Sequence, residues 1–206
     1  MACEGSHDDQ IGEALLIGVV RHQVMTVATE GNAAPVSLPE APAISNSQDQ
    51  KLVEQLAETI RVIGDKLDHD TEFNDMIDGL GKVCDKSSFW TLVEKVFKDD
   101  QINWGRIVVL FYSVGRLAAK MVLARLPRIV SDILSLSLDY FRRRLLGWIC
   151  KMGGWISSIP ALARFSIERF SSASLSTYSF VFGAVLTFTS GALLGAFIVW
   201  RLNKSS

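Results

Sequence analysis

The sequence predicts an all-α protein, a helical bundle with a central hydrophobic hairpin and a C-terminal transmembrane helix. Apolar residues recur at helical spacing along most of the 206 residues, and no stretch keeps up a two-residue alternation. One long uncharged run lies near the C-terminus. With 49% hydrophobic and 21% charged residues, the chain can bury the core of one domain.

The charge is strongly polarised along the chain, although the net charge is only -1. Residues 1–100 carry 8 basic and 19 acidic side chains, whereas residues 101–206 carry 13 and 3. The sequence pI of about 6.3 argues against a nucleic acid as partner. The high hydrophobic fraction argues against a disordered chain, and 3 cysteines are too few for a disulfide scaffold.

Residues 1–26 are expected to form an N-terminal helix region, with the helix itself over 11–25. Its apolar side holds Leu15, Leu16, Val19 and Val20. We expect no signal peptide, because acidic side chains occupy the place of a basic leader segment. Residues 27–50 collect proline, glycine, serine and asparagine, which predicts a flexible linker.

Residues 51–177 are expected to form the helical domain. Its first helix begins at Lys51 and carries one apolar stripe stepping by three or four residues, made of Leu52, Leu56, Ile60, Ile63 and Leu67. Shorter helices are expected at 72–80 and 88–97. Glycines and a polar turn separate them.

Residues 103–145 are expected to form a helical hairpin. Residues 107–115 are uncharged and apolar on nearly all sides, so other helices must wrap this segment in a soluble state. Pro127 suits the first turn of the second helix, which continues to Arg144. Two interpretations stay open: the core of a bundle, or a hairpin that enters a membrane on activation. The arginine run 142–144 is either a solvated helix end or a lipid-headgroup contact.

Residues 178–200 form an uncharged run of 23 residues followed by Arg201. As a helix it is long enough to cross a bilayer, and its place near the C-terminus predicts a single-pass tail anchor with the body in the cytosol. A buried core helix is the alternative. Small residues recur every four positions and could form a helix-packing ridge: Gly183, Thr187, Gly191 and Gly195.

No catalytic pattern is found in the sequence. A phosphate-binding loop, a nucleophile elbow and a zinc-protease motif are all absent. The three cysteines and three histidines show no metal-ligand spacing, and in a cytosolic body the cysteines are expected to be reduced. We therefore expect neither an enzyme nor a bound metal or cofactor.

Three motifs resemble those of the Bcl-2 family of apoptosis regulators, in the family's order and spacing. Residues 52–68 resemble homology motif 3, residues 96–115 motif 1, and residues 139–156 motif 2. The motif 3 residues are Leu56, Ile60, Ile63, Gly64, Asp65 and Leu67. The motif 1 residues, expected in a groove, are Asn103, Trp104, Gly105 and Arg106. The motif 2 residues are Trp148, Gly153, Gly154 and Trp155.

The resemblance is closest to the family's pro-apoptotic effectors, of the Bax and Bak type. It implies a Bcl-2-like helical bundle that forms homo-oligomers and permeabilises the mitochondrial outer membrane, releasing cytochrome c and promoting caspase activation. The implied partners are a second copy, other family members, motif 3-only activators and mitochondrial lipid. The alternative is an anti-apoptotic guardian that sequesters motif 3 helices in its groove without forming pores.

The resemblance also assigns roles to single residues. Asp65 would meet Arg106 of a groove, while the motif 3 anchors are buried in the same molecule or presented to a neighbour. The tryptophans are expected to pack in a core or groove floor. The long tail differs from the tail of the family's soluble members. Two resting locations therefore stay open, the membrane and the cytosol.

Overall fold

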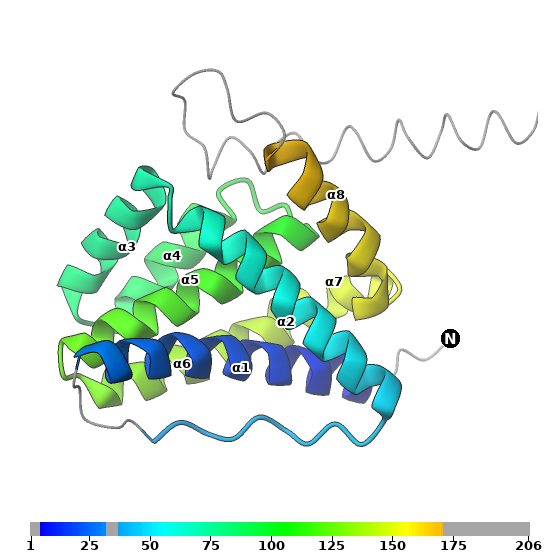
Figure 1. The fold of residues 1–206 in the computed structure, drawn as a ribbon, viewed down its shortest axis with the longest axis horizontal. Helices are drawn as coiled ribbons and strands as arrows, with labels where there is room; N and C mark the ends of the chain where they lie inside the picture. The colour runs from blue at the N-terminus through cyan, green and yellow to red at the C-terminus, as the bar shows by residue number, and fades with distance from the viewer. Residues whose placement is uncertain (1–4, 32–36, 171–206) are drawn as a thin grey trace, which may run out of the picture.

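The computed structural model describes residues 5–31 and 37–170, which form helices joined by loops (Figure 1). No β-strand occurs within these ranges, which confirms the predicted all-α class. The helices are α1 (Gly5–Gly31), α2 (Ser47–Leu67), α3 (Thr71–Val83), α4 (Ser87–Val96), α5 (Trp104–Leu123), α6 (Pro127–Tyr140), the π-helical turn η1 (Phe141–Leu145), α7 (Leu146–Lys151), the 3-10 turn η2 (Trp155–Ser157) and α8 (Ser158–Phe170).

The first two helices are longer than the sequence pattern predicts. α1 continues past residue 25 to Gly31, because no proline or glycine interrupts it after Gly18. α2 begins at Ser47 rather than Lys51, because the Asn46 side chain caps it by accepting a 2.9 Å hydrogen bond from the Gln48 N–H. Residues 27–31 and 47–50, at the two ends of the expected linker 27–50, are therefore helical.

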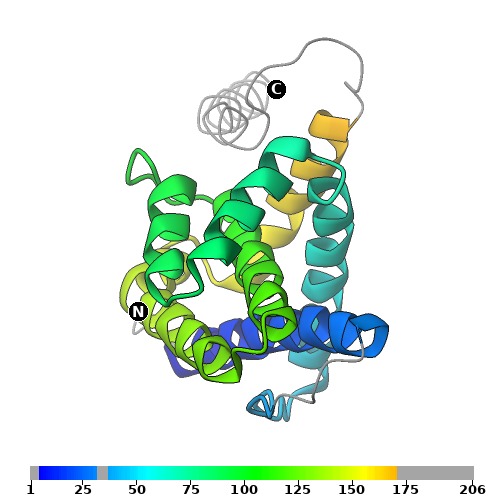
Figure 2. The same cartoon turned by 90° about the vertical axis from the view of Figure 1, so that its left-hand side faces the viewer.

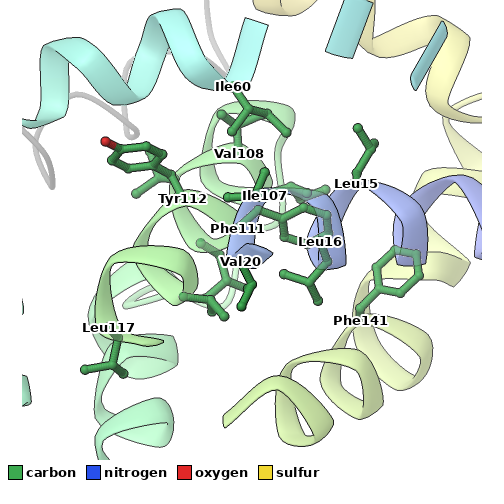
Figure 3. Close-up of a cluster of buried hydrophobic side chains, with 14 of the residues drawn as sticks. Leu15, Leu16, Val20, Ile60, Ile107, Val108, Phe111, Tyr112, Leu117 and Phe141 are labelled. Atoms are coloured by element: carbon green, nitrogen blue, oxygen red, sulfur yellow. The ribbon is translucent and has the colours of Figure 1, made fainter. Parts of the chain in front are cut away.

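α5 is the central helix of the bundle. It packs against α1, α2, α3, α4, α6 and α8, most extensively against α1. Of its 20 residues 17 are buried, which confirms that other helices wrap the apolar segment. Figure 2 shows α1 along the lower edge of the molecule, and Figure 3 shows side chains of α1, α2 and α5 meeting in one cluster. The hairpin thus supplies the core.

α6 forms the second arm of the hairpin, with Pro127 in its first turn as expected. The continuous helix expected up to Arg144 is interrupted, because residues 141–145 adopt the wider π-helical turn. Phe141 and Leu145 at its ends are both fully buried, while the three arginines between them are exposed. Across this turn, two large apolar side chains thus lie in the core and the cationic run faces outward.

One helix within the described ranges is long and apolar enough to cross a membrane, over His7–Thr29 of α1. Its side chains Leu15, Leu16 and Val20 lie in the core against α5 (Figure 3). A helix that packs in the core of a folded domain has the same apolar composition. The expected transmembrane segment 178–200 lies outside the described residues. Its packing ridge of Gly183, Thr187, Gly191 and Gly195 lies there too and stays a prediction.

Candidate helix-binding site

The motif 3 anchors are packed inside the molecule. Leu56, Ile60 and Ile63 are 1%, 2% and 1% exposed, and Leu67 is half-buried. α2 packs on α5, and Figure 3 shows Ile60 next to Val108 of that helix. Of the two arrangements left open by the sequence, this structure has the anchors buried in the same molecule. They become available to a neighbour only if α2 leaves α5.

Gly64 packs tightly against Tyr112 of α5. A Cβ atom at this position would overlap the ring of Tyr112, which is 3% exposed on α5. The absence of a side chain therefore lets the two helices meet. The helix that packs against Gly64 is α5 of the same molecule.

Polar side chains along α5 hold the C-terminal end of motif 3, and the sequence pattern alone did not reveal this role. Asp68, the residue after α2, lies 3.4 Å from Nε of Arg116. Burial, together with a hydrogen bond to Asp68, raises the pKa of the Tyr112 hydroxyl well above its usual value. One turn further along α5, Lys120 pairs with Asp78 of α3 at 2.7 Å. The four-residue spacing of these α5 side chains was the available signal.

Asp65 faces away from the packed stripe. Its side chain is 59% exposed, and its carboxylate lies 3.4 Å from Nη1 of Arg61 on the same helix. Glu58 holds the same arginine more closely, at 2.9 Å through Nε. Exposed pairs of this kind add little stability, so the fold itself does not require Asp65.

The motif 1 residues form the first turn of α5 and are mostly buried. Asn103 caps the helix, its Oδ1 accepting a 2.9 Å hydrogen bond from the Arg106 N–H. Trp104, Gly105 and Arg106 are buried, and Arg106 is only 3% exposed. The predicted groove residues therefore lie together at one helix end, with Trp104 packed as expected, and their role in a groove stays a prediction.

Arg106 is held by Asp99 of the loop between α4 and α5, not by Asp65 of motif 3. Its guanidinium donates to both carboxylate oxygens of Asp99, at 3.0 Å from Nη2 to Oδ2, and to the Gln101 carbonyl at 2.7 Å. The expected pairing of Asp65 with Arg106 does not occur within one molecule, because the two side chains belong to separate sites here. Between molecules it stays a prediction.

The ion pair of Asp99 with Arg106 predicts a specific acid dependence of stability. Hydrogen bonds from Arg106 hold the pKa of Asp99 down to about 2, against 3.8 for an ordinary aspartate. The ionised form is thus favoured in the folded state, so the pair stabilises fully above about pH 4 and its contribution is lost as the pH falls through about 2.

We expect Asp99→Asn to lower the free energy of unfolding by about 1 kcal/mol near pH 7, after allowance for solvent screening. The difference from the wild type should shrink between about pH 4 and pH 2 in denaturant titrations. Asp100→Asn is the control, because Asp100 is exposed and makes no bond to Arg106. An Asp99→Asn difference that does not change over this range would contradict the assignment.

The motif 2 residues close an aromatic cluster at the base of the hairpin. Trp155 is 2% exposed, and its ring lies 5.7 Å from Trp104, 6.0 Å from Phe111 and 6.3 Å from Phe141. Trp148 lies 5.0 Å from Trp104. The expected packing role of these tryptophans is confirmed.

The two motif 2 glycines make the turn that places Trp155. Gly153 and Gly154 have φ values of 95° and 77°, and the Gly154 N–H donates to the Ile149 carbonyl at 3.0 Å. Asp8 of α1 then accepts a 3.1 Å hydrogen bond from the Trp155 N–H. The indole Nε1 also donates to the Asp8 carbonyl at 2.9 Å. Asp8 therefore supports the site, a role that no motif in the sequence indicated.

Other candidate features do not involve the predicted site residues, although some lie within the motif ranges. An open depression of about 640 Å³ lies between α4 and the end of α6, lined in part by Trp90, Phe97 and Tyr140, and none of the residues predicted to bind a helix lines it. Arg142 pairs with Asp9 and Glu13 of α1. Cys84 and Cys150 form no disulfide bond. Within the described ranges, no group of three or more acidic, histidine or cysteine side chains could hold a metal.

Comparisons with known proteins agree with the three motifs. The sequence model for apoptosis regulator proteins of the Bcl-2 family matches residues 60–155. The apoptosis regulator BAX of Homo sapiens is 31% identical over 144 residues, covering 70% of this chain and 71% of BAX. The human Bcl-2 homologous antagonist/killer is 26% identical over 189 residues, covering 90% and 81%. The apoptosis regulator Bcl-2 of Cricetulus griseus is 30% identical over 113 residues, covering 55% and 44%.

Solved structures agree on the fold. Chicken BOK has a TM-score of 0.54 at 16% identity and is matched over 75% of this chain and 98% of its own. Trichoplax adhaerens trBcl-2L2, solved bound to the trBak BH3, has a TM-score of 0.51 at 20% identity over 71% and 96%. The shared fold, the family match and the identity to BAX together show that this chain belongs to the Bcl-2 family of apoptosis regulators.

Proposed function

We propose that this protein is a pro-apoptotic effector that oligomerises and permeabilises the mitochondrial outer membrane, releasing cytochrome c and promoting caspase activation. The observation that carries the proposal is the 31% identity to BAX over 144 residues, 70% of this chain. The match to the Bcl-2 homologous antagonist/killer, over 90% of this chain, adds support. Fold alone does not separate killers from guardians in a shared architecture, so the proposal rests on the two longer sequence matches.

The packing of α2 makes helix exchange between copies physically reasonable. The stripe of Leu56, Ile60 and Ile63 is buried on α5, so its release alone would expose apolar surface. Docking of the same stripe in the groove of a second copy would bury that surface again. The exchange is then close to balanced, and a modest bias from an activating helix can shift it.

The proposed exchange of α2 between copies also indicates which partners this protein would bind. The structure of trBcl-2L2 bound to the trBak BH3 supports a motif 3 helix as the kind of ligand that this fold accepts. We propose a second copy, other Bcl-2 family members and motif 3-only activators as partners. The released α2 would present Asp65 to Arg106 of the partner's motif 1.

The membrane role is proposed for two parts of the chain. Residues 178–200 would anchor the protein in the mitochondrial outer membrane with its body in the cytosol. α5, with 17 of 20 residues buried, would find an alternative apolar environment in the bilayer once α1 and α2 move away. Mitochondrial lipid is therefore a proposed partner as well.

A second candidate function is an anti-apoptotic guardian that binds motif 3 helices without forming pores. The match to hamster Bcl-2, at 30% identity over 113 residues, favours it. That match covers 55% of this chain, less than the match to BAX. We therefore place the guardian second.

Dye release from liposomes tests the proposal. Full-length protein, in liposomes of mitochondrial lipid composition, should release trapped dye when a motif 3 peptide is added. Asp65→Asn should lower the release rate about two- to threefold, because Asp65 is exposed at rest and meets Arg106 only on docking.

The matched control is Glu58→Gln. It removes the same charge from the same exposed face, where Glu58 also pairs with Arg61, and should leave release unchanged. Peptide binding without release under any activation would identify the guardian instead. Absence of both binding and release would reject both functions.

A further inference from the structure

Arg106 is a buried cation whose anion is supplied by its own chain. The residue is 3% exposed, and a guanidinium so far from water needs a bonded carboxylate. Asp99 meets that need from seven residues away, on the loop that enters α5. The groove arginine expected for an incoming aspartate is therefore already occupied.

The loop holds Asp99 in place for this pairing. Its Oδ1 also accepts a 3.1 Å hydrogen bond from the Gln101 N–H. The Gln101 carbonyl in turn accepts from Arg106 at 2.7 Å. Asp100 adopts a φ of 56°, which turns the chain sharply between these two residues. The carboxylate is thus a fixed part of the site at rest.

Two donors at the same site remain without a bonded acceptor in the described structure. Nε of Arg106 and Nδ2 of Asn103 are both buried and have no hydrogen-bond partner. Asp99 occupies the terminal nitrogens of Arg106 and leaves Nε free. Unsatisfied buried donors are rare in folded proteins, so the hydrogen bonding at this helix start is incomplete at rest.

We propose that Asp99 is a built-in competitor for Arg106, which lowers the groove's preference for a helix that carries an aspartate. The inference rests on the proposed function, since it concerns the same groove. A helix without the carboxylate leaves the resting pair intact. A helix with it exchanges one carboxylate for another at Arg106 and gains little. Asp99 thereby holds back docking of the protein's own motif 3.

A double-mutant cycle on the full-length protein tests the competitor. The probes are fluorescent peptides of residues 52–68, one with Asp65 and one with Asp65→Asn. For the wild type, we expect the second peptide to bind at most about threefold more weakly. For Asp99→Asn the ratio should rise to about tenfold or more, because the buried guanidinium then lacks any other carboxylate.

Two further variants keep the test decisive. Asp100→Asn makes the same charge change beside the site, at a positive φ that asparagine tolerates, and should keep the wild-type ratio. Asp99→Glu keeps a carboxylate in a shifted position and should give an intermediate ratio, even if Asp99→Asn folds poorly.

The outcomes separate this inference from the proposed function. Peptide binding with the wild-type ratio in both Asp99 variants overturns the competitor and leaves the helix-binding groove standing. A rise that Asp100→Asn reproduces overturns it too, since the effect is then general electrostatics. Absence of saturable binding to all four proteins overturns both the groove and the competitor.

Discussion

Gly64→Ala is expected to lower the free energy of unfolding by about 2 kcal/mol, although alanine is the better helix former. The new methyl group would overlap the Tyr112 ring, and Tyr112 has little room to move because α3 and α1 also enclose it, through Phe73 and Gln23. The helix-propensity gain of about 1 kcal/mol offsets only part of this strain. Denaturant titration of the full-length protein measures the change.

Gly79→Ala is the matched control. Gly79 lies within α3, where an added Cβ would meet nothing within 4 Å. This substitution should raise stability by about 0.5–1 kcal/mol. Similar effects at both glycines would show that close packing of α2 on α5 is not what Gly64 provides.

Gly64→Ala also has a functional consequence under the proposed mechanism. A strained contact between α2 and α5 favours the state in which α2 has left, so less activating peptide should be needed for half-maximal dye release from liposomes. If Gly64→Ala is destabilised and needs as much peptide as the wild type, release of α2 does not limit activation.

Trp155→Ala is expected to lower the free energy of unfolding by about 3–5 kcal/mol, as is typical when a large buried ring is removed. The indole is 2% exposed and packs with Trp104, Phe111 and Phe141. Its Nε1 also donates to the Asp8 carbonyl, so truncation leaves a buried acceptor without its donor. Thermal and denaturant unfolding give the value.

Trp90→Ala serves as the control for residue type. Trp90 is 46% exposed on α4, with its ring 5.1 Å from Phe89 and 6.3 Å from Tyr140. Its truncation should cost about 1 kcal/mol, because much of the ring already contacts water. Equal losses at the two tryptophans would contradict the central place of the Trp155 cluster.

Much of the fold could be predicted from residue spacing. The stripe of Leu56, Ile60 and Ile63, the proline that starts α6 and the apolar segment of α5 each follow from local chemistry. Helix ends were less predictable. The start of α2 depends on a capping bond from Asn46, and no local signal in the sequence marks the π-helical turn at 141–145.

Only part of the candidate site could be predicted from the sequence, for a physical reason. The spacing of motif residues along one helix is a local property, so the sequence predicts which of them share a face. The partners of Arg106, Gly64 and Trp155 were not predictable, because Asp99, Tyr112 and Asp8 come from loops or helices whose approach depends on packing.

The sequence by itself determined the helical class, the order of the three motifs and the apolar character of the hairpin, since periodicity and residue type are local properties. Only the tertiary structure decided which partner each motif has at rest. Motif 3 lies on α5 of its own molecule, and Arg106 is paired with Asp99, because burial makes an unpaired cation or an exposed apolar stripe unfavourable.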